Sequence, residues 1–116
     1  SPLTAVLIEQ FGGAVARIGR DETAFDHRDA EYNLAIIGRW PDPGMNDDGI
    51  AWTRELWTAM QPHARGVYVN YLGVGESASR VKDAFGEEKY ARLAALKRQY
   101  DPANLFRFNQ NIPPAP

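Results

Sequence analysis

The chain has 116 residues, which is enough to enclose one hydrophobic core but too few for two domains of ordinary size. Hydrophobic residues make up 44% and aromatic residues 11% of the sequence, which excludes a disordered polar chain. Thirteen basic and fifteen acidic residues give a formal charge of -2, so we expect neither nucleic acid nor a membrane as a partner. The absence of cysteine excludes disulfides, thiolate metal sites and a cysteine nucleophile. It does not fix the compartment, for which we expect the cytoplasm.

The N-terminal part of the sequence predicts strands. Residues 4–9 are apolar and rich in β-branched side chains, and Gly12-Gly13 separates them from a similar run at 14–18. These runs indicate two strands joined at a glycine turn, or one long strand that bends there. Polar residues 19–30 are typical of a loop, and the alternation over 32–40 predicts a further strand.

Helical spacing dominates the rest of the chain. Residues 46–60 begin with Asn and two Asp residues, which suit a helix N-terminus, and they place apolar side chains on one face. A cap at Ser77 or Ser79 predicts a short helix that ends at Gly86. A longer helix is predicted over 87–100, where apolar residues again form one stripe.

One further strand and an extended tail complete the predicted elements. Residues 66–72 alternate with period two, so Tyr68 and Asn70 would share one face of a strand. The tail over 104–116 is rich in Asn and Pro, which indicates an extended strap. This order of elements predicts an α+β fold in which helices pack on one face of an antiparallel sheet.

Two local patterns imitate ligand sites. The glycine turn over 72–78 lies between a predicted strand and a predicted helix, but it lacks the third glycine of a dinucleotide-binding loop, and a plain turn is favoured. The run 26–29 contains His27, but neither it nor His63 has the neighbouring ligands of a metal site. We therefore predict no metal site and interpret 26–29 as a polar loop with solvated charges.

The tryptophans and a tyrosine–asparagine pair allow two interpretations each. Trp40, Trp52 and Trp57 could line a pocket, but aromatic residues at strand or helix spacing usually build cores and interfaces. Tyr68 and Asn70 could face a planar cofactor, where both would donate and accept hydrogen bonds, or they could satisfy each other as a structural pair. The residue pattern alone does not decide whether Tyr68 and Asn70 face a cofactor or form a structural pair.

Short motifs follow one another in a fixed order over nearly the whole chain. They are Gly12-Gly13-Ala14, Thr23-Ala24-Phe25, His27-Arg28, Trp40, Phe85-Gly86, Lys97 and the segments 66–71, 89–93, 100–107 and 109–113. This series resembles the C-terminal portion of the berberine-bridge-enzyme-like FAD-linked oxidases, a family of the vanillyl-alcohol-oxidase or PCMH-type flavoproteins. The final third is the most specific part of the resemblance.

The resemblance implies a domain organisation and a site. Residues 1–104 would form the C-terminal part of a substrate-binding domain, and residues 105–116 would dock on an FAD-binding domain that this sequence does not contain. Tyr68 would face the substrate and take part in deprotonating a hydroxyl, so we expect it to be catalytic. Asn70 and Tyr71 would bind the cofactor, with Asn70 contacting the flavin ring.

The resemblance also implies a function and partners. We expect the C-terminal fragment of an FAD-dependent oxidoreductase that oxidises an alcohol, amine or sugar-like substrate and is incomplete by itself. FAD would belong to the full-length parent and would not be held tightly by this chain alone. The start at Ser1-Pro2-Leu3 suits a fragment, and Asn111, where plant-type relatives have serine, implies a bacterial branch. The alternative is a flavin-free binding or dimerisation module, and either form could self-associate through the sheet or the Trp-bearing helix.

Overall fold

The computed structural model describes residues 1–73 and 75–116. The contacts between residues divide the chain into two compact units. One unit contains residues 1–11 and 30–65, and the other contains residues 12–29 and 66–116. Each unit therefore joins two segments that are far apart in the sequence. The glycine turn predicted over 72–78 includes residue 74, which lies outside the described residues.

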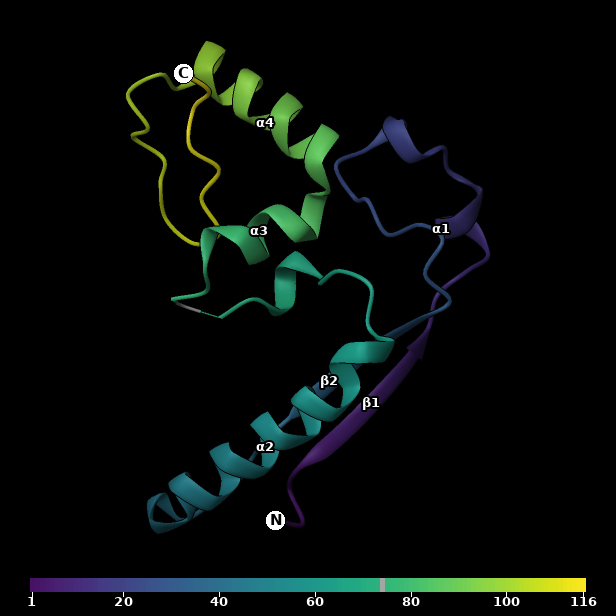
Figure 1. The fold of residues 1–116 in the computed structure, drawn as a ribbon, viewed down its shortest axis with the longest axis vertical. Helices are drawn as coiled ribbons and strands as arrows, with labels where there is room; N and C mark the ends of the chain where they lie inside the picture. Colours follow the sequence, from purple (N-terminus) through teal and green to yellow (C-terminus); the bar gives the residue numbers. More distant parts are fainter. Residues whose placement is uncertain (74) are drawn as a thin grey trace. The chain divides into compact units, whose positions relative to one another are not determined.

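The first unit combines two antiparallel strands with a helix. β1 (Ala5–Gln10) pairs with β2 (Tyr32–Ile37), so that Ala5 lies opposite Ile37. α2 (Asn46–Met60) runs alongside these strands and contacts β2 (Figure 1). Because an isolated two-stranded sheet is marginally stable in water, the helix contributes much of what holds this unit together.

β1 is apolar but remains accessible to solvent. The Ile8 side chain is 70% exposed, and Val6 and Leu7 are also exposed. Among the described residues the sheet has only two strands, so β1 is an edge strand. An exposed apolar edge of this kind is a surface on which another strand can pair.

The second unit is mainly helical. It contains α1 (Ala14–Arg17), α3 (Ala78–Phe85) and α4 (Glu87–Tyr100). Ser77 caps α3, because its hydroxyl accepts the backbone N–H of Arg80 at 3.4 Å. α4 has acidic residues in its first turn and basic residues in its last turn, as the helix dipole favours. The core of this unit consists of Leu72, Val81 and Ala84, with Val67, Val69, Phe85, Tyr90 and Ile112 packed against it.

Short 3-10 turns connect these elements. They lie over Arg20–Glu22, Pro43–Met45, Gln61–His63 and Val69–Tyr71. No helix among residues 1–73 and 75–116 is both long enough and apolar enough to cross a membrane.

The C-terminal tail is anchored on the second unit. It leaves the end of α4 and returns beside that helix (Figure 1). The Gln110 side-chain amide donates to the Leu72 carbonyl at 2.7 Å, and the Ala115 N–H donates to the Ala94 carbonyl at 3.0 Å. Ile112 adds an apolar contact to the core. The tail contains no helix or strand over 104–116 and bends at Asn109, so it is not one continuous extended segment, and a boundary at residue 104 stays a prediction.

The α+β class with an antiparallel sheet is confirmed. Helices occur where local patterns predicted them, over 46–60, 78–85 and 87–100. The strands predicted over 4–9 and 32–40 correspond to β1 and β2.

The strand predicted over 14–18 is wrong. Residues 14–17 form α1 instead, and the Val15 N–H donates to the Gly12 carbonyl at 3.1 Å. β1 pairs instead with β2 over six consecutive residue pairs, and the four pairs from Ala5–Ile37 to Ile8–Leu34 join apolar residues. The glycine pair therefore leads into a helical turn rather than a hairpin.

The strand predicted over 66–72 is also wrong. The Tyr71 N–H donates to the Tyr68 carbonyl at 2.9 Å, and the Leu72 N–H donates to the Val69 carbonyl at 3.2 Å. These local bonds satisfy backbone groups that a strand would pair with a neighbour. The apolar residues of this segment are used to contact the core, which explains why a strand-like pattern occurs in a turn.

Candidate functional site

Tyr68, Asn70 and Tyr71 lie together at one short turn of the second unit. The Asn70 Nδ2 atom donates a hydrogen bond to the Tyr68 hydroxyl oxygen at 2.8 Å. The Tyr68 and Tyr71 rings have centroids 5.2 Å apart and meet edge to face at 77°. The three predicted site residues are therefore neighbours, although a 3-10 turn rather than a strand presents them.

This turn is anchored by apolar residues and keeps its polar residues near the surface. Val67 and Val69 pack against the core, and Leu72 is 8% exposed. Asn70 and Tyr71 are exposed, and Tyr68 is half-buried. A side chain on a turn that is fixed at several points has little freedom, which suits a group that must meet a ligand in one geometry.

An aromatic residue from a distant segment supports Tyr68. The Phe25 ring lies edge to face with the Tyr68 ring, with centroids 6.0 Å apart and an angle of 89°. The Phe25 ring also lies edge to face with the His27 ring, with centroids 6.4 Å apart. The Arg28 guanidinium carbon lies 5.4 Å from the Phe25 ring centroid. Edge-to-face pairs contribute about 0.5 to 1.5 kcal/mol beyond the area that they bury.

The loop that carries Phe25 is held by a buried ion pair. The Lys89 ammonium lies 3.1 Å from the Asp26 carboxylate, and these side chains are only 8% and 11% exposed. Arg20 adds a second ion pair to Asp26 at 3.0 Å. Burial tends to raise the pKa of Asp26, but hydrogen bonds from Arg20 and Lys89 outweigh it and hold that pKa below its ordinary value. The prediction that charges in 26–29 are solvated is therefore wrong for Asp26.

The histidine of this loop makes a structural contact. His27 Nε2 lies 3.1 Å from the Asp83 carbonyl oxygen, which accepts a hydrogen bond from the imidazole N–H. Arg28 donates to the Val15 carbonyl at 2.8 Å, so it ties the loop to α1. Within residues 1–73 and 75–116, no group of three or more histidine or acidic side chains is arranged to hold a metal ion.

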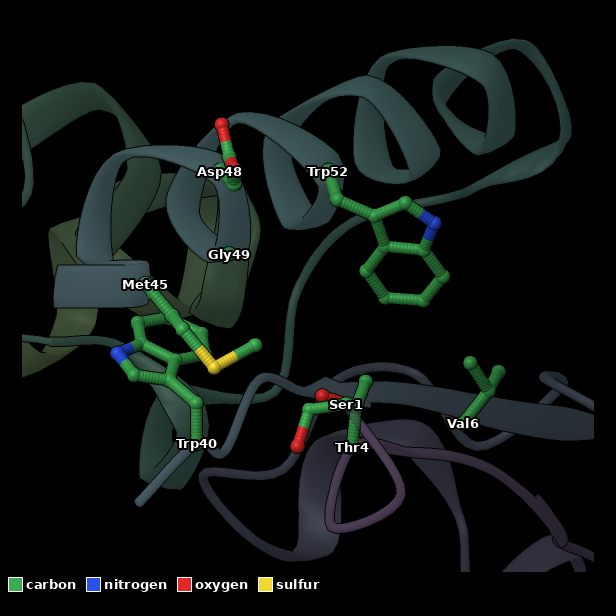
Figure 2. A pocket seen from close by; sticks show the side chains of 8 residues that line it. All are labelled: Ser1, Thr4, Val6, Trp40, Met45, Asp48, Gly49 and Trp52. Atoms are coloured by element: carbon green, nitrogen blue, oxygen red, sulfur yellow. The ribbon is translucent and has the colours of Figure 1, made fainter. Parts of the chain in front are cut away.

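A hollow of about 470 Å³ lies in the first unit. Trp40 and Met45 lie at one side and Trp52 at the other, with Val6 of β1 pointing toward Trp52 (Figure 2). The Trp40 indole N–H donates to Asn46 at 2.6 Å, whereas Trp52 is 45% exposed. Trp40 therefore has a structural partner, and Trp52 mainly lines the hollow. The remaining lining residues are Ser1, Thr4, Asp48 and Gly49.

Comparisons with known proteins agree on one group of flavoproteins. Residues 67–113 match the family described as berberine and berberine like. The FAD-linked oxidoreductase YgaK of Bacillus subtilis is 36% identical over 106 residues, which are 91% of this chain and 23% of that protein. Berberine bridge enzyme-like 23 of Arabidopsis thaliana is 32% identical over 127 residues, which cover 94% of this chain and 24% of that protein.

A solved structure extends the similarity to the fold. The xylooligosaccharide oxidase from Myceliophthora thermophila, solved with xylobiose, has a TM-score of 0.72 and 28% identity to this chain. The match covers 96% of this chain and 25% of the oxidase chain. The chain is related to the berberine-bridge-like FAD-linked oxidoreductases. It spans about a quarter of the length of the curated relatives it matches. The family resemblance drawn from the motifs is confirmed, and a bacterial origin stays a prediction because relatives occur in bacteria, plants and fungi.

Sequence reasoning missed the residues that support Tyr68. Phe25 and Lys89 both occur in motifs of the family resemblance, but nothing in the sequence indicates that they meet. Lys89 donates to the Phe25 carbonyl at 2.8 Å although the two residues are 64 positions apart. In the sequence, Asp26 is one residue of the charged run 26–29, and nothing there indicates that it pairs with Lys89. An unusually buried lysine is visible only after folding.

Proposed function

We propose that this chain is the C-terminal part of an FAD-dependent oxidoreductase that oxidises an alcohol, amine or sugar-like molecule. The observation that carries the proposal is the anchored turn on which Tyr68, Asn70 and Tyr71 meet. The relatives named FAD-linked oxidoreductases support the reaction class. The oxidase solved with xylobiose supports a sugar-like molecule among the candidate substrates.

Asn70 and Tyr71 are the residues that would hold the flavin ring. A carboxamide offers both donors and an acceptor, and a tyrosine ring offers a flat apolar face, so this exposed pair fits a planar heterocycle. FAD, when bound, supplies a ring that accepts the hydride removed from the substrate carbon. We expect the nucleotide part of FAD to be bound by another domain of the parent protein.

Tyr68 would take the proton that the substrate releases. As the carbon loses its hydride, the O–H or N–H bond of the substrate breaks, a double bond to carbon forms, and the proton passes to the Tyr68 oxygen, which must be a phenolate in order to accept it. The Asn70 amide donates to this same oxygen at 2.8 Å and would stabilise negative charge on it. Asn70 would therefore both orient the phenol and assist its role as a base.

The proposal is tested by Tyr68→Phe in the full-length flavoprotein that contains this chain. Flavin reduction would be followed by the loss of visible absorbance after anaerobic mixing with benzyl alcohol, benzylamine or xylobiose. At least one probe should reduce the unmodified enzyme, and the variant should react about 10² to 10⁴ times more slowly. Tyr90→Phe removes the same hydroxyl from a residue packed on the core and should react normally. Reduction by none of the probes, or an unchanged Tyr68→Phe rate, would refute the proposal.

The tail supplies the proposed contact with the FAD-binding domain. Leu105, Phe106 and Phe108 are 72%, 81% and 85% exposed, although the backbone around them is anchored. Three large apolar side chains held outward in this way are unusual on a free surface and are typical of an interface. We propose that they pack on the FAD-binding domain of the parent.

This contact is tested by replacing both phenylalanines with serine in the full-length protein. The double variant Phe106→Ser and Phe108→Ser should release FAD at a lower denaturant concentration than the unmodified protein. Arg107→Ser changes the exposed residue between them and should retain FAD normally. Equal FAD retention in all three proteins would show that the tail aromatics do not form the interface.

A further inference from the structure

Lys89 connects α4 to the loop behind Tyr68. Its ammonium donates to the Phe25 carbonyl at 2.8 Å and lies 3.1 Å from the Asp26 carboxylate. The Phe25 ring in turn supports the Tyr68 ring at 6.0 Å. One cation therefore binds two consecutive residues of the loop, and the first of these residues contacts the proposed catalytic tyrosine.

This connection is buried and closely fitted. Lys89 is 7% exposed as a whole residue, so its ammonium has little access to water. Gly86 adopts a φ of +72°, and a Cβ atom there would lie 2.6 Å from the Asp26 carboxylate. The helix junction at this glycine thus leaves room for Asp26 to reach the ammonium. A buried charge without a partner is strongly unfavourable. The Lys89 ammonium, the Asp26 carboxylate and the Phe25 carbonyl should therefore stay together in the folded state.

We propose that Lys89 and Asp26 are positioning residues for Tyr68, acting through the Phe25 loop. The proposal rests on the proposed catalytic role of Tyr68. Neither Lys89 nor Asp26 needs to touch the substrate, because the Phe25 carbonyl and ring transmit the constraint. The Asn70 bond fixes the Tyr68 oxygen locally, and Phe25 fixes the ring from the other segment of this unit.

The geometry indicates what should change when the ion pair is removed. Without the ammonium, the Phe25 carbonyl loses its hydrogen bond and the loop loses its attachment to α4. The Phe25 backbone then has one constraint fewer, and a shift of this residue would displace its ring relative to Tyr68. A displacement of about 1 Å in a catalytic group can cost about 10²-fold in rate, even when ligand binding is little affected.

The test compares Lys89→Met with Lys82→Met in the full-length flavoprotein. Lys82 forms a surface ion pair with Glu87 at 2.6 Å, and its side chain is 41% exposed, so this variant is a matched loss of a lysine. Lys89→Met should slow flavin reduction about 10- to 100-fold with little change in the probe's dissociation constant. Asp26→Asn should have a smaller effect, because Lys89 keeps its bond to Phe25. Lys82→Met should react normally.

A second variant and a structural measurement cover the other outcomes. If Lys89→Met does not fold, Phe25→Leu leaves the ion pair in place and should slow reduction in the same selective way. Crystal structures of the folded variants should show the Tyr68 ring displaced from its position in the unmodified protein. An undisplaced ring, or a rate within twofold of normal for both variants, would overturn the proposal. If Tyr68→Phe itself proves harmless, the catalytic proposal fails, and the ring position alone still decides whether Lys89 positions Tyr68.

Discussion

The Lys97 ammonium and the Asp101 carboxylate lie 2.5 Å apart where α4 ends. Asp101 also accepts the backbone N–H groups of Leu105 at 2.8 Å and Phe106 at 3.0 Å. One carboxylate therefore ends the helix and directs the first residues of the tail. The hydrogen bond from Lys97 holds the pKa of Asp101 below its ordinary value, burial opposes this, and the two N–H groups add to the lowering.

Asp101→Asn should remove a pH-dependent part of the stability. Because the pKa of Asp101 is lower in the folded than in the unfolded state, its carboxylate stabilises the fold above the unfolded value of about 3.9. That contribution is lost as the pH falls through the folded-state pKa. Urea midpoints measured from pH 2 to pH 6 should therefore show the advantage of the unmodified protein over the variant shrinking toward low pH. Asp29→Asn, at an exposed aspartate, should not show this pattern.

Gly66→Ala should destabilise the second unit. Gly66 has a φ of +72°, and a Cβ atom there would lie 2.1 Å from the His27 ring. The strained backbone and the clash predict a loss of about 1 to 3 kcal/mol in the free energy of unfolding. Denaturant unfolding of Gly73→Ala is the comparison, because a Cβ atom at Gly73 meets nothing within 4 Å. Equal stability of the two variants would contradict the packing of His27 against Gly66.

The chain purified by itself should be colourless. Its mass is 13.0 kDa, and the residues proposed to contact FAD are confined to one exposed turn that would hold only the flavin ring. Binding of the ring alone leaves most of FAD without partners, so we expect no tight complex. Intact mass and the visible absorbance spectrum measure this directly. A yellow protein of this mass would show that the chain binds flavin without another domain.

Ile8→Lys should reduce self-association of the isolated chain. Ile8 is 70% exposed on β1, which is an edge strand of the two-stranded sheet in the described part of the chain. A lysine there removes apolar surface and places a charge on the edge, which opposes strand pairing between copies. Light scattering should show association at least about tenfold weaker than in the unmodified chain, about 1.4 kcal/mol. Gln61→Lys adds the same charge outside the sheet and should leave association unchanged.

Local sequence patterns predicted the helices better than the strands. α4 is set by acidic residues in its first turn and basic residues in its last, and Ser77 marks the start of α3. These signals act over a few neighbouring residues and need no distant partner. A strand forms only when a neighbouring strand pairs with it. The apolar runs at 14–18 and 66–72 have a strand-like pattern, but neither belongs to the two-stranded sheet of the described residues.

The sequence by itself determined the family resemblance and the main helices, because motif order and helix signals are properties of the chain, and the roles of Tyr68, Asn70 and Tyr71 stay predictions. Only the tertiary structure decided that β1 pairs with β2 and that Tyr68 and Asn70 meet on a turn. It also placed Lys89 against the Phe25 loop, 64 positions away. Contacts of this range depend on how whole elements pack, and no local pattern of residues encodes that packing.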